Sequence, residues 1–146
     1  MDIKVAKRSM DRFKRIARRR YPLEYLEILI GRISPEAIEI VKSVPILHTA
    51  TLDSANRNAG CEWEDSALEI LKLKAGREGL VFLGTIHSHP DYSTNTVSEG
   101  DNASALTNQE QVFGIYSFKK NGKTGHGADS KLCFYLPQKA VSIQTP

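Results

Sequence analysis

Residues 80–89 read LVFLGTIHSH, a continuous apolar run with β-branched residues that ends in two histidines. A run of this kind is typical of a strand that is buried on both faces of a sheet. Pro90 follows directly and predicts the end of the strand, because it lacks the backbone N–H that a residue inside a sheet donates to the neighbouring strand. The stretch therefore predicts a central strand that carries two histidines to the rim of a sheet, where loops build sites.

Two amphipathic helices are expected before this strand, and a weaker one, over residues 98–109, after it. The first covers residues 6–20 and is stopped by Pro22. Its apolar face, at helical spacing, consists of Ala6, Met10, Phe13 and Ala17. The second covers residues 63–79 and ends at Gly76 or Gly79. Its apolar side is expected to consist of Trp63, Ala67, Leu68, Ile70, Leu71 and Ala75.

Further apolar runs predict strands, and turn-rich stretches separate them. These strands are expected over residues 24–31, 36–47, 111–120 and 131–137, the first of them ending at Gly31. Residues 48–62 are polar and predict a loop, and Asn121 with Gly122 predicts a hairpin turn. Because strands alternate with helices, the expected fold class is α/β or α+β, with a single mixed β-sheet flanked by two or three helices.

The composition is that of one globular domain over residues 1–146. Apolar residues make up 40% of the chain and charged residues 25%, which excludes an intrinsically disordered protein. No apolar run approaches the roughly 20 residues that a membrane helix needs, and the N-terminus has no signal core, so we expect a cytoplasmic protein. Cys61 and Cys133 form neither a disulfide framework nor a zinc pair, and both are expected to be buried.

Positive charge is concentrated at the N-terminus. The chain has a formal net charge of +3, but residues 4–20 alone carry nine Lys or Arg against one Asp. One interpretation is the solvated face of a docked helix. The other is a binding surface for an acidic partner or for nucleic acid. No aromatic residues interleave with the charges in a pattern for stacking bases, so an acidic partner is favoured over nucleic acid.

The two histidines of the central strand can converge on one metal ion. Residues i and i+2 of a strand point to the same face, which places His87 and His89 roughly 6.6 Å apart at the backbone. Catalytic zinc sites use three protein ligands, and Asp101 is the candidate for the third. Ser98 and Asp101 also fit the capping box of a helix, so these two residues allow a structural interpretation beside the metal site.

Hydrolysis at such a site needs a carboxylate that moves a proton from water to the leaving group. From the residues alone, Glu24, Glu27 and Glu36 compete for this role, and the structural alternative for the last two is a solvated charge. His48 and His126 lie in polar or Gly-rich stretches and are expected to be surface residues. Other metal motifs, such as H-E-x-x-H or H-x-E with P-C-x-x-C, do not occur in the sequence.

HSHP at 87–90 followed by S-x-x-D at 98–101 resembles the signature of the JAB/MPN (JAMM) metalloproteases. YPLEYLEILIGR at 21–32 is similar to that family's P-x-E at a helix end, followed by an apolar strand closing on Gly. The resemblance implies a JAB/MPN-like, cytidine-deaminase-like architecture and one Zn²⁺ per chain, held by His87, His89 and Asp101. It also implies Glu24 as general acid/base and Ser98 as the hydrogen-bond donor to the oxyanion. One departure is the loop Pro90–Val97, which has eight residues where the family has seven.

The same resemblance implies a function. It predicts a zinc-dependent isopeptidase or peptidase that cleaves after the C-terminal tail of ubiquitin, a ubiquitin-like protein or a sulfur-carrier protein. The tail is expected to add as a strand beside the site. The alternative is a JAB/MPN-fold binding or scaffold module without catalysis. Such relatives typically lose ligands, whereas this sequence keeps the complete set, which favours an enzyme.

Overall fold

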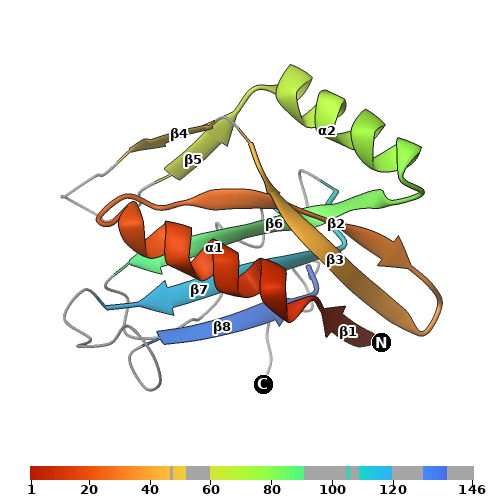
Figure 1. Ribbon diagram of the computed structural model, residues 1–146, viewed down its shortest axis with the longest axis horizontal. Coiled ribbons are helices and arrows are strands. Elements are labelled where there is room, and N and C mark those ends of the chain that lie inside the picture. Colours follow the sequence, from red (N-terminus) through yellow and green to blue (C-terminus); the bar gives the residue numbers. More distant parts are fainter. Residues whose placement is uncertain (47, 52–59, 91–104, 106–108, 120–129, 138–146) are drawn as a thin grey trace.

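The computed structural model describes residues 1–46, 48–51, 60–90, 105, 109–119 and 130–137 (Figure 1). They form the elements β1 (Asp2–Val5), α1 (Lys7–Arg19), β2 (Leu26–Ile33), β3 (Ala37–Pro45), β4 (His48–Thr51), β5 (Gly60–Trp63), α2 (Asp65–Arg77), β6 (Val81–Pro90), β7 (Val112–Phe118) and β8 (Ser130–Tyr135). No helix among these residues is long and apolar enough to cross a bilayer.

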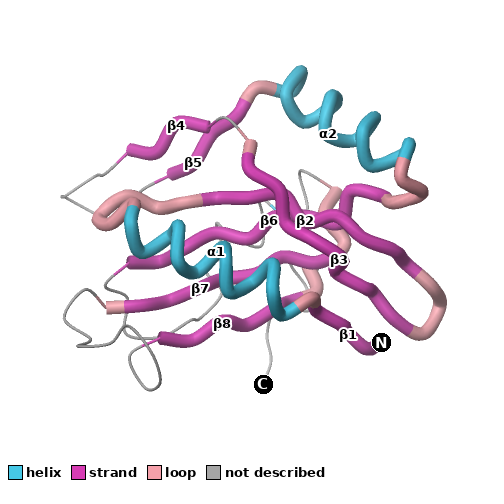
Figure 2. Tube along the Cα trace, in the orientation of Figure 1, coloured by secondary structure: helices cyan, strands magenta, loops and turns pink. Residues whose placement is uncertain are grey.

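The centre of the structure is a six-stranded mixed sheet in the order β1-β3-β2-β6-β7-β8 (Figure 2). Strand β6 pairs antiparallel with β2 and parallel with β7, while β7 pairs antiparallel with β8. Strands β4 and β5 form a separate two-stranded antiparallel sheet. The expected class is confirmed: one mixed sheet with two helices, whose central strand is the one that carries the histidines.

The two faces of the sheet are covered by different helices. Along β2, Leu29 packs with α1, whereas Ile28 and Ile30 pack with α2, as the two-residue period of a strand requires. Helix α1 crosses the near face of the sheet in Figure 1 and buries the stripe Met10, Phe13 and Ala17 that the sequence predicts. Phe13 is fully buried, which stabilises the fold by about 2–3 kcal/mol relative to an exposed ring.

Several expectations about the elements were wrong. Strand β1 was not expected, and residues 48–62, expected as a loop, contain β4 and β5. Helix α2 begins at Asp65, so Trp63 belongs to β5. On that helix Leu68 and Ala75 are buried, two turns apart on one face, whereas Ile70 is 56% exposed because it lies about 200° around the axis from Leu68.

Strand β2 does not end at Gly31 as expected but continues to Ile33. The register of β2 shifts between Ile30 and Gly31 against β3. A Cβ at position 31 would lie 1.8 Å from the carbonyl oxygen of Glu39. Glycine is therefore needed inside the strand, where the neighbouring backbone comes close, and not as its terminator. Gly79, by contrast, has a φ of +74° and does end α2, as one of the two predicted glycines.

Some predictions lie outside the described residues: most of the helix over 98–109, the turn at Asn121, the side chain of Cys61 and residue His126. The pairing of β7 with β8 confirms the expected strands on either side of that turn. Cys133, in β8, is half-buried, not fully buried as predicted.

Candidate metal centre

His87 and His89 lie on one side of β6 with their rings together. Their Nε2 atoms are 2.8 Å apart and their ring centroids 4.7 Å apart; His87 is half-buried and His89 buried. Two nitrogens on one tetrahedral zinc, each at about 2.0–2.1 Å, lie roughly 3.3 Å apart. The rings need to separate by only about half an ångström to share an ion. The convergence predicted from strand parity is therefore confirmed.

Glu24 completes a three-residue group with these histidines. One carboxylate oxygen of Glu24 and one nitrogen from each ring all lie within 4.8 Å of one another. Glu24 is only 8% exposed and sits in the segment between α1 and β2. Two imidazoles and a carboxylate are a donor set that suits zinc. The residues present therefore fit a metal ion, and they come from two segments sixty residues apart in the chain.

Ser88 fixes the distance between these two segments. The backbone N–H of Tyr25 donates to Ser88 Oγ at 2.8 Å, and the backbone N–H of Ser88 donates to the carbonyl oxygen of Tyr25 at 2.9 Å. Ser88 is fully buried. Because Tyr25 directly follows Glu24 and Ser88 lies between the histidines, this pair of bonds clamps the carboxylate opposite the rings. The sequence interpretation gave Ser88 no role, although strand parity turns it away from the histidines into a buried face, where a hydroxyl needs a partner.

The metal group lies on the face of the sheet opposite α1. His87 is the register partner of Leu26, and side chains of directly paired residues on antiparallel strands lie on the same face. Leu26 packs in the cluster under α2. The basic helix α1 therefore covers the other face of the sheet and does not line the metal group.

Glu27 is not the solvated charge that the sequence suggested, because it is fully buried. Its carboxylate is ion-paired with Arg12 and accepts hydrogen bonds from Ser43 Oγ at 2.7 Å and from the Tyr25 hydroxyl at 2.6 Å. It lies on the α1 side, three residues after Glu24, and serves to join α1, β2 and β3. Glu36 is exposed, as expected. Of the three candidate carboxylates, Glu24 is therefore the one that stands beside the histidines.

Burial, and then the hydrogen bond to Glu27, raise the pKa of Tyr25 well above its usual value near 10. The phenol therefore stays protonated and donates to Glu27 at any pH in which the protein works. This donor keeps the Tyr25 side chain in place on the α1 side of the sheet.

Asp101, Ser98 and the loop from Pro90 to Val97 lie outside the described residues, apart from Pro90 itself at the end of β6. The third zinc ligand and the oxyanion donor that the resemblance implies stay predictions. The side chain of His48 also lies outside the described residues.

The fold of the chain is similar to that of several solved structures. It is similar to protein DSY2949 from Desulfitobacterium hafniense (20% identity, TM-score 0.58, covering 92% of this chain and 83% of that one). It is also similar to AF2198, a JAB1/MPN domain protein from Archaeoglobus fulgidus (17% identity, TM-score 0.51, covering 92% and 89%). A protein from Salinibacter ruber gives 16% identity and a TM-score of 0.58, covering 91% and 80%. Identities this low show a shared fold only.

Family membership comes from the sequence itself. No curated protein matches the chain. The family model for prokaryotic homologues of the JAB domain matches residues 6–124, most of the chain, and this span includes both segments of the metal group. The chain therefore belongs to the prokaryotic JAB-domain family.

Proposed function

We propose that this protein is a zinc-dependent peptidase or isopeptidase that hydrolyses the amide bond after the C-terminal tail of ubiquitin, a ubiquitin-like protein or a sulfur-carrier protein. The observation that carries the proposal is the group of Glu24, His87 and His89, whose ligand atoms lie within 4.8 Å of one another at the end of the central strand. Membership of the JAB-domain family supports it.

The chain's residues divide the work of the reaction. His87 and His89, with Asp101 as the proposed third ligand, hold the ion. Zinc in such a site lowers the pKa of water to about 7 and polarises a carbonyl. Glu24 takes the proton of the attacking water on its carboxylate and passes it to the leaving amine as the carbon–nitrogen bond breaks. Ser98 donates a hydrogen bond to the oxyanion formed at the carbonyl.

Burial favours Glu24 as the proton carrier. A carboxylate at 8% exposure has lost most of its water, and the two imidazoles lie close to it. The Ser88 clamp holds it at one distance from the rings. Proton transfer in the transition state needs such a fixed geometry, since a displacement of about 1 Å can lower a rate roughly a hundredfold.

A substrate tail that adds as a strand needs a free sheet edge. Strands β2 and β6 are each paired on both sides in the central sheet, so they cannot accept another strand. The two-stranded sheet of β4 and β5 has outer edges that no other described strand occupies, and Trp63 of β5 packs in the same cluster as Leu26. We therefore propose β4–β5 as the place where the tail binds.

The test is cleavage of a fusion in which a ubiquitin-like protein is joined through its C-terminal tail to a reporter protein. The wild type, loaded with zinc, is expected to release the reporter, and Glu24→Gln is expected to retain zinc and lose cleavage. Glu36→Gln is the matched control, because Glu36 is exposed and outside the metal group, and it should cleave as the wild type does. Full activity in Glu24→Gln would show that Glu24 does not carry the proton. A zinc-loaded wild type that cleaves none of these fusions would favour a binding module without catalysis.

A further inference from the structure

We propose that a groove between α1 and β3 binds an acidic segment of a protein partner. The groove has a volume of about 660 Å³, and its lining residues include four cationic ones, Arg8, Arg12, Arg15 and Lys42, against one acidic residue, Asp11. It lies on the α1 side of the sheet, so it is separate from the metal group. The proposal does not depend on the protein being a peptidase.

Two of the four cations are already neutralised. Arg12 is ion-paired with the buried carboxylate of Glu27, and Lys42 Nζ lies 2.7 Å from Glu78 Oε2. Arg8 and Arg15 are exposed, and within the part of the chain that the structure describes neither pairs with a carboxylate. The attraction for an anion therefore comes from these two arginines.

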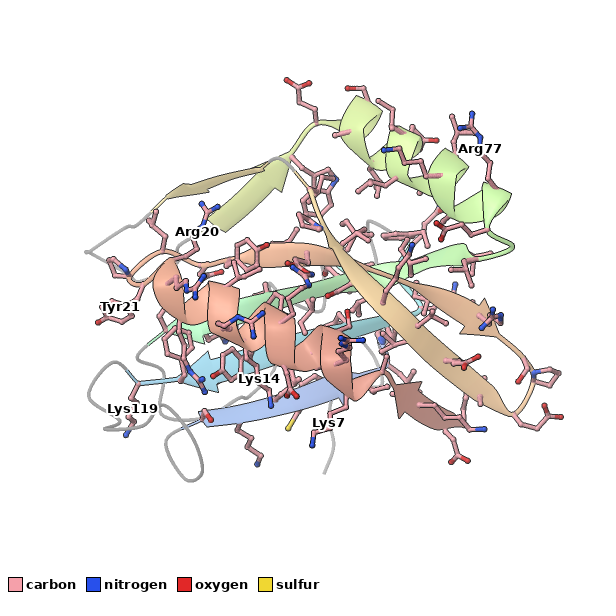
Figure 3. All side chains as sticks on the ribbon, viewed as in Figure 1. Lys7, Lys14, Arg20, Tyr21, Arg77 and Lys119 are labelled. Carbon is pink, nitrogen blue, oxygen red and sulfur yellow. The ribbon has the colours of Figure 1, made fainter. Side chains whose placement is uncertain are left out.

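The two arginines face the same side of α1 at a useful spacing. They are seven residues apart, which is two turns and about 10.5 Å along the axis. In a polyproline II peptide, which has three residues per turn, carboxylates three residues apart lie on the same side and about 9.3 Å from each other. Each guanidinium offers a planar fork of donors that matches a carboxylate. Figure 3 shows α1 across the near face of the sheet, with Lys7 and Lys14 of this helix labelled. A short acidic segment that lies along α1 can engage both arginines.

Recognition in this groove relies on side chains, since the edge of β3 that it borders is occupied. The backbone N–H of Ser43 donates to Ser9 Oγ at 2.8 Å, and Arg12 donates to the carbonyl oxygen of Ser43 at 3.2 Å. The backbone N–H and carbonyl oxygen of Ser43 are therefore already bonded and do not offer a pairing site to a strand of the partner. Charge complementarity with Arg8 and Arg15 is what the groove offers.

The mixed charges favour an acidic peptide over nucleic acid. Asp11 lines the groove between the arginines, so a continuous phosphate backbone would meet an acidic residue as well as basic ones. Among the described residues that line the groove, none is aromatic and able to stack a base. A peptide can place its carboxylates at the arginines and other residues elsewhere.

The test is fluorescence anisotropy with a labelled octaglutamate peptide, alongside octaglutamine and an eight-nucleotide oligouridylate. The wild type is expected to bind octaglutamate with an affinity that falls as salt rises, and to bind octaglutamine far more weakly. Arg8→Glu/Arg15→Glu should lower the affinity for octaglutamate by about tenfold or more. Arg8→Gln/Arg15→Gln should show a smaller loss in the same direction.

The matched control is Lys74→Glu/Arg77→Glu on α2, which changes the net charge equally at exposed positions away from the groove. It is expected to bind octaglutamate within about twofold of the wild type, because screening limits the effect of distant charges. Equal losses in the two charge-reversal variants would mean a general effect of net charge and overturn the proposal. So would absence of octaglutamate binding, or tighter binding of the oligouridylate that is lost in the groove variant.

Discussion

At the scale of single residues, the structure assigns different tasks to neighbouring side chains of two short segments. Glu24 and the two histidines form the metal group, while Tyr25 and Ser88, each adjacent to a member of it, bind each other. Polar side chains on opposite sides of one strand therefore have separate roles, one chemical and one positional.

Ser88→Ala tests the positional role. The substitution leaves the buried N–H of Tyr25 without its acceptor, which costs about 1–3 kcal/mol and frees Glu24 to move. We expect zinc content to be retained and kcat for the fusion substrate to fall, with KM little changed, and Ser88→Thr to restore most of kcat. Ser43→Ala is the control: it removes another buried hydroxyl from the sheet, one bonded to Glu27, and should lower stability without lowering kcat. Equal losses of kcat in Ser88→Ala and Ser43→Ala would contradict the clamp.

The pH dependence of stability tests the environment of Tyr25. Its pKa is raised in the folded protein above the unfolded value near 10, so its contribution is complete below pH 10 and is lost as pH rises through and beyond that value. Tyr25→Phe removes this titration. Urea unfolding from pH 8 to pH 11 should therefore show a steeper loss of unfolding free energy in the wild type than in Tyr25→Phe. Parallel slopes for the two proteins would show that Tyr25 does not contribute.

At the scale of the elements, the close approach of β2 to β3 depends on Gly31. A methyl group there would meet the carbonyl oxygen of Glu39 at 1.8 Å, so Gly31→Ala must displace one backbone and should lower the unfolding free energy by about 1–3 kcal/mol. Gly76→Ala is the matched control, because nothing lies within 4 Å of a Cβ there, and in a helix it should raise stability by about 0.5–1 kcal/mol. Chemical denaturation measures both, and the same sign for the two variants would contradict this explanation of Gly31.

The sequence predicted the elements where a single periodicity was strong. The α1 stripe and the apolar runs of β6 and β7 are examples, because burial on one or both faces leaves a pattern in the chain. It failed for β1, β4 and β5, each four residues long, where pairing with another strand and not an apolar pattern decides the structure. Ile70 was misplaced because apolar residues do occur on exposed faces.

The site was predictable to a similar extent. Strand parity alone predicted that His87 and His89 lie together. Glu24 was one of three candidates from the residues alone and was singled out by the family resemblance, and the structure places it beside the histidines and buries Glu27 elsewhere. The burial of Glu27 depends on Arg12 and Ser43, which come from two other elements. Contacts of that kind leave no local signal in a single sequence.

At the scale of the whole molecule, a metal ion held by His87 and His89 binds the folded chain, in which β6 brings the two rings together. Binding to the folded state alone stabilises it by about 2.7 kcal/mol at a hundredfold excess over Kd. For a chain of this size we expect zinc to raise Tm by roughly 5–10 °C. A thermal scan with and without a chelator measures the shift, and a chelator that leaves Tm unchanged would contradict a site of this kind.

The central claim is that His87 and His89 hold a metal ion beside Glu24, and zinc stoichiometry after equilibrium dialysis tests it most directly. The account predicts one zinc per chain in the wild type and none in His89→Ala, with Glu36→Gln, an exposed position outside the group, retaining the ion. A wild type that binds no zinc, or a His89→Ala variant that binds as much as the wild type, would contradict it.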